Sequence, residues 1–359
     1  MPDMRFAPPN PLRIADRASG LNAISVRSYN ERLVLSLLLQ NDATTRLEIG
    51  EKTGLSAQTI SVIVRSLEQE GLVVRGQAQR GRVGPPTTPL MLNPEGAFSV
   101  GVSVGHRNAH IVLVDFVGNV KFARSVPHRT PGEFDDVDGV TREVAAAVAS
   151  LSRHERTRIA GIGVGIPAPN EGRMASNEEL HKRLEIDLGL PVFVQNDIAA
   201  AAAGESLFGP ARTLQDFLYF YLGARLHSRL ILNHQIYNGN SPVSHDVGVS
   251  ALERSLVSKE AAELVWNSSA DWTNLGQIGT EWFDECVNKL VGSITALSQF
   301  IEVQTIVLAS FVPLSVTARL CSEVESKLPF IQALPGKTGV APKAIGAASL
   351  PFSSRFMLE

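Results

Sequence analysis

Apolar residues recur at helical spacing in three short segments near the start of the chain. The first lies in residues 28–42, with an apolar stripe of Leu33, Val34, Leu37 and Leu38. The second begins at Thr45, which forms a capping-box pattern with Glu48, and it ends before Gly54. The third begins at Ser56, and its apolar face consists of Ile60, Ile63, Val64 and Leu67. The spacing therefore predicts three helices with a tight glycine turn between the second and the third.

The segment after the third helix has the pattern of a β-hairpin. Leu72–Val74 predicts a strand, residues 77–86 a loop rich in glycine and proline, and Thr87–Leu92 a returning strand. Helix, helix, tight turn, helix and hairpin is the order of a winged helix-turn-helix. We assign residues 25–95 to such a domain, after a flexible polar arm over residues 1–24, and expect it to bind double-stranded DNA.

The third predicted helix carries polar side chains near its N-terminus, where a recognition helix meets base edges in the major groove. Further along, Arg65 can reach a phosphate, and two arginines of the hairpin loop can follow the backbone or enter a minor groove. The candidate DNA-contacting residues are Thr45, Ser56, Gln58, Thr59, Ser61, Arg65, Arg80 and Arg82. The pattern alone leaves open a small helical domain used for protein contacts, such as dimerisation.

From Asn93 onward the pattern changes to apolar strands, many of them containing glycine, mixed with helices. Three successive strands are predicted first, in residues 98–105, 109–115 and 120–126. Later strands are predicted in residues 158–169, 191–197, 216–223, 229–239 and 304–310, and helices in residues 198–209, 282–300 and 316–327. This mixture favours an α/β domain over residues 96–359, with two lobes and a cleft between them.

Composition places the chain among ordinary globular proteins. Hydrophobic residues make up 44% of the 359 positions, charged residues make up 19%, and the formal net charge is −3. The first 96 residues are slightly basic and the remainder is acidic, which is too mild an asymmetry to demonstrate DNA binding. No apolar run is long enough to span a bilayer, and the N-terminus lacks the apolar segment of a secretory signal. We therefore expect a cytoplasmic location, and the only two cysteines, Cys286 and Cys321, do not form a disulfide framework.

The chain from about Ser28 to Pro351 resembles the ROK family, which contains sugar kinases and transcriptional regulators. The matching stretches are GLSAQTISVIVRSLEQEGLVVR, RGRVGPP, LNPEGAFSVGVSVG, IVLVDFVGNV, GIGVGIPAP, LGLPVFVQNDIAAAAAGE, TIVLAS and AIGAA. The resemblance implies an α/β fold in which an N-terminal winged helix-turn-helix precedes a two-lobed, actin/hexokinase-like (ribonuclease H-like) ROK domain. It also implies a homo-oligomer, dimer or tetramer, that binds a pseudo-palindromic operator and responds to a sugar or sugar derivative.

The same resemblance argues against catalysis. In ROK kinases the first phosphate loop contains a metal-orienting aspartate and glycines that let the backbone approach phosphate. Here Ser103 replaces the aspartate, and His106 and Arg107 replace a glycine and a threonine. The second loop corresponds to residues 223–229 and has lost four of its five glycines. Basic residues of the two segments, such as Arg229, could hold an anion, but we expect solvated loops, no enzymatic activity and no cofactor.

The zinc site of the family is missing as well. ROK proteins commonly hold Zn²⁺ with one His and three closely spaced Cys beside the sugar pocket. In this chain Val249 stands where the His ligand would fall, and the loop with the cysteines is absent. His245 lies nearby, but a single His does not form a structural zinc site. We therefore expect no bound metal.

Part of the sugar-binding pattern is retained. Asn196 and Asp197 match the Asn-Asp pair whose carboxylate acts as general base in the kinases. Asp246 replaces a sugar-binding glutamate, and Glu253 and Glu205 match further family glutamates. Asn196, Asp197, Asp246 and Glu253 are therefore the candidate ligand-binding residues, because carboxylates and amides suit sugar hydroxyls. The alternative is that Asn196 and Asp197 simply cap the alanine-rich helix that follows.

Together these features predict a DNA-binding transcriptional regulator, a repressor of carbohydrate-utilisation genes, whose kinase-like domain senses a sugar without phosphorylating it. One alternative is an active sugar kinase with an appended DNA-binding module, which the retained Asp197 favours and the lost glycines oppose. Another is a regulator that has lost its small-molecule effector and responds to a protein partner.

Overall fold

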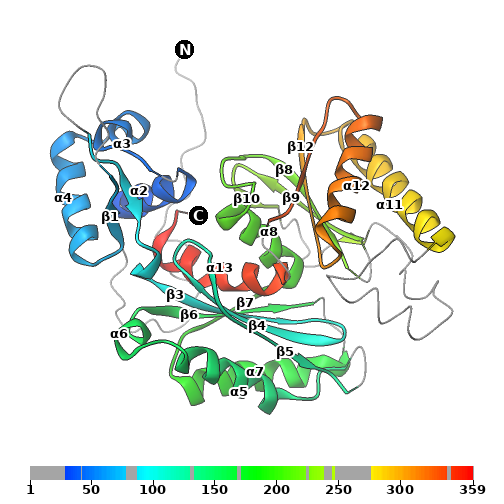
Figure 1. Ribbon diagram of the computed structural model, residues 1–359, viewed down its shortest axis with the longest axis horizontal. Helices are drawn as coiled ribbons and strands as arrows, with labels where there is room; N and C mark the ends of the chain where they lie inside the picture. The colour runs from blue at the N-terminus through cyan, green and yellow to red at the C-terminus, as the bar shows by residue number, and fades with distance from the viewer. Residues whose placement is uncertain are drawn as a thin grey trace.

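A computed structural model shows three parts of the chain around one central helix, α13 (Pro342–Phe356). The N-terminal helices lie on one side of α13, one β-sheet lies beneath it, and a second sheet lies on its other side (Figure 1). The structure describes residues 29–41, 43–77, 87–129, 133–167, 171–223, 226–237, 245–246, 276–337 and 341–358.

The N-terminal unit has the predicted order of three helices and a hairpin. Its elements are α2 (Tyr29–Gln40), α3 (Arg46–Thr53), α4 (Ala57–Gln69), β1 (Val73–Arg75) and β2 (Leu90–Leu92). The two strands pair antiparallel, with Val74 opposite Met91. The returning strand β2 is shorter than the predicted Thr87–Leu92, and the hairpin loop over residues 78–86 lies outside the described residues.

The local signals in the sequence explain where these helices begin and end. Thr45 caps α3 in a capping box with Glu48, and the backbone bond from Thr45 lowers the pKa of the Glu48 carboxyl. Gly54 ends α3 with φ 71°, a left-handed conformation that glycine adopts without strain. Ser56 caps α4 by accepting a hydrogen bond from the Thr59 backbone N–H at 3.1 Å.

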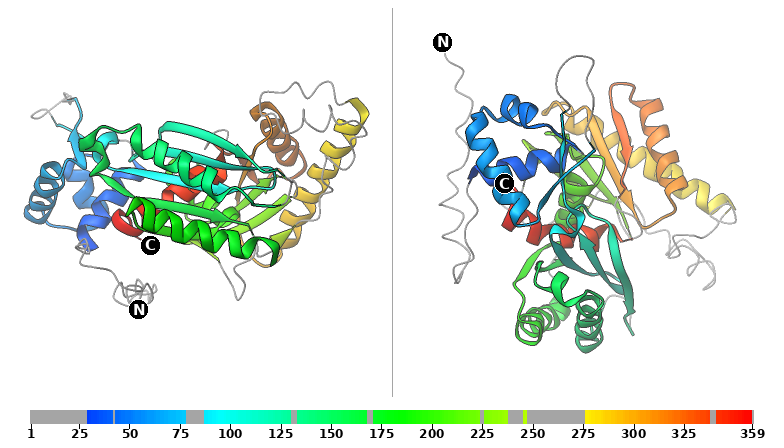
Figure 2. Two further views of the ribbon diagram at one scale, coloured as in Figure 1. Left: turned by 90° about the horizontal axis from the view of Figure 1, so that it is seen from below. Right: turned by 60° about the vertical axis from the view of Figure 1, so that its left-hand side comes forward.

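The first sheet of the large domain has the strand order β5-β4-β3-β6-β7. Its strands are β3 (Phe98–Val104), β4 (Asn108–Asp115), β5 (Val120–Pro127), β6 (Ile159–Ile166) and β7 (Val192–Asn196), with the short helix η1 (Pro94–Gly96) before β3. One face is covered by α5 (Val137–Ala149) and α7 (Glu171–Leu188), and α6 (Arg153–Arg156) precedes β6 (Figure 2). The helix α13 covers the other face.

The helix α13 lies unusually close to the first sheet. A Cβ atom at Gly101 of β3 would collide with the backbone carbonyl of Ala344, and one at Gly163 of β6 would collide with that of Ala347. The glycines in these two apolar strands are therefore required by the close approach of the helix backbone. At these two points there is no room for a side chain between α13 and the sheet.

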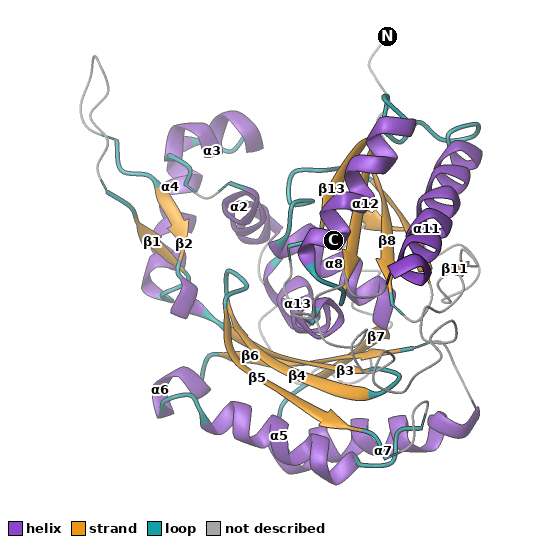
Figure 3. Cartoon of the chain, turned by 45° about the vertical axis from the view of Figure 1, so that its right-hand side comes forward, coloured by secondary structure: helices purple, strands orange, loops and turns teal. Residues whose placement is uncertain are grey.

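The second sheet has the order β10-β9-β8-β12-β13, and β11 also pairs with β9. Its strands are β8 (Phe217–Leu222), β9 (Leu226–Leu232), β10 (Gln235–Ile236), β11 (His245–Asp246), β12 (Thr305–Ser310) and β13 (Gln332–Pro335). The helices α11 (Gly276–Leu297) and α12 (Leu314–Lys327) pack on one face, and α8 (Asp197–Phe208) packs on the other. The helices α8 and α13 thus lie between the two sheets (Figure 3), which confirms the predicted two-lobed α/β fold.

Candidate nucleic-acid interface and candidate ligand site

The helix α4 has one buried face and one solvent-facing stripe. Its apolar residues Ile60, Ile63, Val64 and Leu67 are buried in the core of the N-terminal unit. Gln58, Ser61 and Arg65, at spacings of three and four residues, are exposed on the other side. The same stripe includes Val62, which is 66% exposed and which sequence reasoning missed, although it lies four residues after Gln58. An apolar side chain in this position suits contact with a thymine methyl group.

Several of the predicted DNA-contacting hydroxyls also stabilise the helices that carry them. The Ser56 Oγ and Thr59 Oγ1 atoms are 2.9 Å apart, and Ser61 donates to the Ala57 carbonyl at 2.8 Å. The Thr45 side chain accepts from the Glu48 backbone N–H. Exposed oxygen atoms of caps can contact a phosphate, but their first effect is on the helix N-termini.

The start of the hairpin is fixed to α4 by an ion pair. Arg75 of β1 donates from Nε to the Glu68 carboxylate at 2.6 Å, and Arg46 of α3 lies 4.0 Å from it. The Arg75 bond lowers the pKa of the Glu68 carboxyl. The predicted contact residues Arg80 and Arg82 belong to the hairpin loop and lie outside the described residues.

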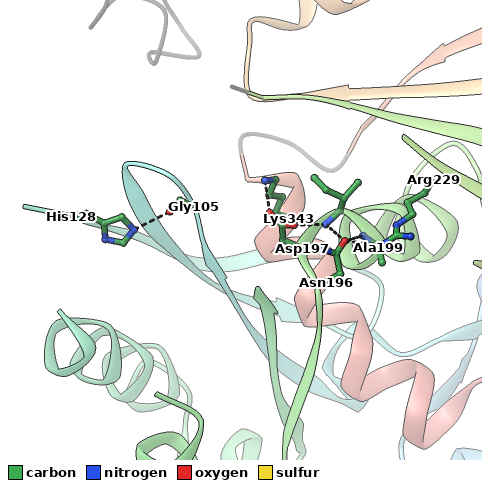
Figure 4. Close-up of polar contacts among 8 residues, drawn as sticks. Gly105, His128, Asn196, Asp197, Ala199, Arg229 and Lys343 are labelled. Atoms are coloured by element: carbon green, nitrogen blue, oxygen red, sulfur yellow. Dashed lines mark hydrogen bonds and ion pairs between the residues drawn. The ribbon is translucent and has the colours of Figure 1, made fainter. Parts of the chain in front are cut away.

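At the candidate ligand site, Asn196 is the N-cap of α8. Its Oδ1 atom accepts from the backbone N–H groups of Ile198 at 3.2 Å and Ala199 at 3.1 Å (Figure 4). Arg229 of β9 donates to the same oxygen at 3.3 Å. The capping alternative raised by the sequence is therefore confirmed for Asn196, and the cap also joins the two lobes through Arg229.

The neighbouring carboxylate of Asp197 forms an ion pair with a residue that sequence reasoning missed. The Lys343 ammonium, in the first turn of α13, lies 2.5 Å from Asp197 Oδ2, and the two side chains are only 21% and 4% exposed (Figure 4). The same ammonium lies 4.6 Å from the centre of the Tyr221 ring of β8. Because the pair is separated by 146 residues, no local pattern in the sequence points to it.

The expectation that residues 223–229 form a solvated loop is wrong for Arg229. This arginine lies in β9 and is only 4% exposed, because the strand pairs with β8 and faces the N-terminus of α8. Burial lowers the pKa of its guanidinium, while the negative charge of Asp197 raises it. Residues 224 and 225 lie outside the described residues.

The segment that replaces the first phosphate loop is a hydrogen-bonded turn between β3 and β4. The Gly105 N–H donates to the Asn108 carbonyl at 2.9 Å, and His128 Nε2 lies 3.1 Å from the Gly105 carbonyl oxygen (Figure 4). The His128 N–H donates to the Arg107 carbonyl at 2.8 Å. His106 is exposed, as expected for a solvated turn, whereas Arg107 is half-buried. These bonds connect the turn to Asn108 and His128.

The remaining candidates of the ligand site are placed only in part. Glu205 is fully buried in α8 and accepts a hydrogen bond from the Lys337 backbone N–H at 3.2 Å. Asp246 lies on β11 opposite His227 of β9, its side chain is outside the described residues, and Glu253 is outside them altogether. The described residues include no cluster of three or more His, Cys, Asp or Glu able to hold a metal ion.

Among the described residues, three arginines attach the N-terminal unit to the large domain, and one of them, Arg212 after α8, donates to the Leu39 carbonyl of α2 at 3.4 Å. Arg32 of α2 donates to the carbonyl oxygens of Met357 at 2.5 Å and of Ser353 and Ser354 at 3.0 Å. Arg158, just before β6, lies 3.4 Å from carbonyl oxygens near the ends of α4 and η1. A single hydrophobic core continues from α2 and α4 to α13. The proposed boundary at residue 95 is therefore not marked by a gap in packing.

Comparison with known families gives two matches along the chain. Residues 27–74 match a winged helix-turn-helix DNA-binding family, and residues 99–256 match the ROK family. In the part of the chain that the structure describes, no helix combines the length and the apolar surface needed to cross a membrane.

Curated relatives of similar sequence include several named repressors. The uncharacterized protein y4fQ of Sinorhizobium fredii is 24% identical, and the match covers 92% of both chains. The xylose repressor of Bacillus subtilis is 26% identical over 62% of this chain and 60% of its own length. The DNA-binding transcriptional dual regulator NagC of Escherichia coli is 24% identical over 63% of this chain and 58% of its own. This chain thus spans about 60% of the length of the repressors that it matches.

Solved structures confirm the fold of both parts. A ROK family transcriptional regulator, described as a homologue of the Escherichia coli MLC protein, aligns with a TM-score of 0.63 and 15% identity over 91% of this chain and 96% of its own. A ROK family glucokinase from Streptomyces griseus aligns with a TM-score of 0.54 and 20% identity over 71% of this chain and 99% of its own. The chain therefore has the fold of a ROK domain behind an N-terminal winged helix-turn-helix, in agreement with the family matches over residues 99–256 and 27–74.

Proposed function

We propose that this protein is a DNA-binding transcriptional repressor of carbohydrate-utilisation genes. The observation that carries the proposal is the exposed stripe of Gln58, Ser61 and Arg65 on α4, within a complete helix-turn-helix joined to a ROK domain. The relatives named xylose repressor and NagC support the same function, since each is similar to this chain and is named for repression or for DNA-binding transcriptional regulation. The protein acts on chromosomal DNA, in the cytoplasm.

In this proposal α4 enters the major groove of double-stranded DNA. Gln58 reads a base edge, because an amide can donate and accept at adenine, and Arg65 neutralises a phosphate. Arg80 and Arg82 of the hairpin contact the backbone or a minor groove. The functional unit is a dimer or tetramer, so the operator is a pseudo-palindrome with half-sites one or more helical turns apart.

The ROK domain is proposed to sense a sugar or sugar derivative without phosphorylating it. Phosphoryl transfer depends on positioning and neutralising the phosphates, and in the first loop Ser103 replaces the aspartate and His106 replaces one of the two glycines used for that task. Asp197, the position of the general base in the kinases, already accepts a hydrogen bond from Lys343. Asn196, Asp197, Asp246 and Glu253 remain the proposed ligand contacts.

DNA binding is tested by selecting bound fragments from a genomic library and footprinting them, with and without candidate sugars. Gln58→Ala should weaken binding and alter base preference at one position of each half-site, and Arg65→Ala should weaken binding to all selected sequences. Gln299→Ala, after α11, and Arg142→Ala, on α5, are exposed controls outside α4. Wild-type protein that enriches no sequence, or variants that bind like the controls, would contradict the proposal.

The absence of catalysis is tested separately with a coupled assay of ADP release over a panel of sugars. No sugar should give turnover above the background without protein. Turnover that is abolished by Asp197→Asn would show an active sugar kinase instead, and it would overturn this part of the proposal while leaving DNA binding intact.

A further inference from the structure

The helix α13 touches both the candidate ligand site and the DNA-binding unit. Lys343 lies in its first turn, and Ser353, Ser354 and Phe356 lie in its last. With 15 residues, the helix spans about 20 Å at 1.5 Å per residue. Figures 1 and 2 show its C-terminal end against the N-terminal helices and the rest of it between the two sheets.

The first turn of α13 is held by charge. Lys343 is the cation that pairs with the buried Asp197 carboxylate, and its ammonium also lies against the Tyr221 ring. It is close enough to His110 of β4 to help burial lower the pKa of that imidazole. Any ligand whose hydroxyl groups hydrogen bond to Asp197 must share this carboxylate with Lys343, or displace the ammonium from it.

The middle of α13 packs backbone against backbone. Besides the contacts of Gly101 and Gly163 with its carbonyls, Gly346 lies so close to α8 that a Cβ there would collide with the backbone of Ala200 and Ala201. Pro351 lies inside the helix and provides no N–H for the Ala347 carbonyl, which instead faces the sheet at Gly163. Backbones in direct contact do not deform gradually. A displacement of α13 would therefore move α8 with it as a rigid element.

The last turn of α13 is held by the DNA-binding unit itself. Here Arg32 of α2 donates to the Ser354 and Met357 carbonyls at the end of the helix, and also to the Ser353 carbonyl, which accepts the Met357 N–H as well. Ser36 of α2 accepts from the Leu358 N–H at 2.9 Å. Phe352 and Phe356 of α13 both pack edge-on against Phe116, inside the core that also contains α2. The attachments through Arg158 and Arg212 do not use side chains of α13.

We propose that α13 transmits the state of the Asp197 site to the winged helix-turn-helix. A polyhydroxylated ligand that binds Asp197 releases Lys343, α13 shifts, and α2 follows through Arg32. The released state holds α4 in a position that fits the operator less well. This inference rests on the proposed function for its output, but the mechanical link itself can be measured without DNA.

The first experiment measures amide hydrogen exchange in Lys343→Met, which removes the ammonium and mimics release. Exchange should become faster in the peptide that covers α2, as well as in the first turn of α13 and in α8. Peptides from α5 and α12 report global destabilisation, and Lys289→Met, on the exposed side of α11, is the matched control. Faster exchange confined to α8 and the first turn of α13 would overturn the inference. Lys343→Met combined with Asp197→Asn removes both charges of the ion pair, and this double variant replaces the single variant if that one does not fold.

The second experiment is a double-mutant cycle on DNA affinity, using sequences that the wild-type protein selects. Lys343→Met should lower affinity at least about fivefold. Residues as far apart as Lys343 and Arg32 normally act additively, so a double variant with Arg32→Gln should deviate from additivity by more than about twofold only if they are coupled. Arg158→Gln with Lys343→Met should be additive. Additivity in both pairs would overturn the inference. A wild-type protein that selects no DNA would contradict the proposed function, and the hydrogen-exchange experiment would then decide whether α13 links the two sites.

Discussion

The polar side chains of α4 and those around Asp197 differ in what they face. Gln58 and Arg65 are exposed to solvent on the surface of a short helix. Asn196, Asp197 and Lys343 are turned inward, between two sheets, where each contacts a protein group. The exposed set, Gln58 and Arg65, is available to an external partner. The enclosed set, Asn196, Asp197 and Lys343, already forms hydrogen bonds or ion pairs within the protein.

The difference shows how the two sites can change function. Replacing a solvent-facing side chain changes the free energy of unfolding little, so the identity of that residue can be set by what it binds. A buried charge must be paired, so the Asp197 carboxylate has a structural reason to keep a cationic partner that is independent of catalysis. A residue that matches a catalytic position is therefore weak evidence of catalysis until its partners are known.

The largest expected effect on stability comes from breaking the buried pair. Lys343→Met removes the ammonium that pairs with the Asp197 carboxylate and should lower the free energy of unfolding by about 3 kcal/mol, the low end for a broken buried pair because Lys343 is partly exposed and the interaction with Arg229 remains. Urea unfolding followed by circular dichroism measures it. Adding Asp197→Asn should recover much of the loss. A loss below about 1 kcal/mol would mean that the pair of Asp197 and Lys343 contributes no more than a solvent-exposed ion pair.

A smaller loss is expected at the cap of α8. Asn196→Ala removes the acceptor of two backbone N–H groups and of Arg229, and should cost about 2 kcal/mol, the upper end for a helix N-cap. Asn196→Ser keeps an oxygen at the cap and should recover part of this. If both variants unfold like the wild type, the cap contributes nothing, and Asn196 is held in place only for a ligand.

His110, which lies close to Lys343, should also make the free energy of unfolding depend on pH. Burial, with Lys343 and His128 nearby, lowers the pKa of His110 from its usual 6.5. Below about pH 6.5 the unfolded chain therefore takes up a proton that the folded protein does not, and the free energy of unfolding falls as pH decreases towards the folded pKa. His110→Gln should reduce this slope in urea unfolding measured from pH 7.5 to pH 5. Equal pH slopes in the wild type and in His110→Gln would show that His110 is not the source of the pH dependence.

Sequence reasoning succeeded where the causes of structure are local. The capping box at Thr45, the glycine stop at Gly54 and the cap at Asn196 depend on neighbouring residues, and the structure has all three. It failed for pairs between distant segments, because the partners of Asp197 and of Arg32 lie 146 and more than 320 residues away. The helices α5, α7 and α13 were missed too. The sequence of α7 has little apolar periodicity, and α13 contains a proline.

The smallest change in the free energy of unfolding is expected for a substitution on the exposed stripe of α4, where DNA binding and stability should separate most clearly. Gln58→Ala removes a solvent-facing amide from α4 and replaces it with a better helix former, so the free energy of unfolding should change by less than about 0.5 kcal/mol. The same variant should still lose affinity and base preference for selected DNA. Unfolding and binding measured on one preparation test both halves together. A stability loss like that of Asn196→Ala would mean that Gln58 has a structural partner, and α4 would then have no stripe reserved for DNA.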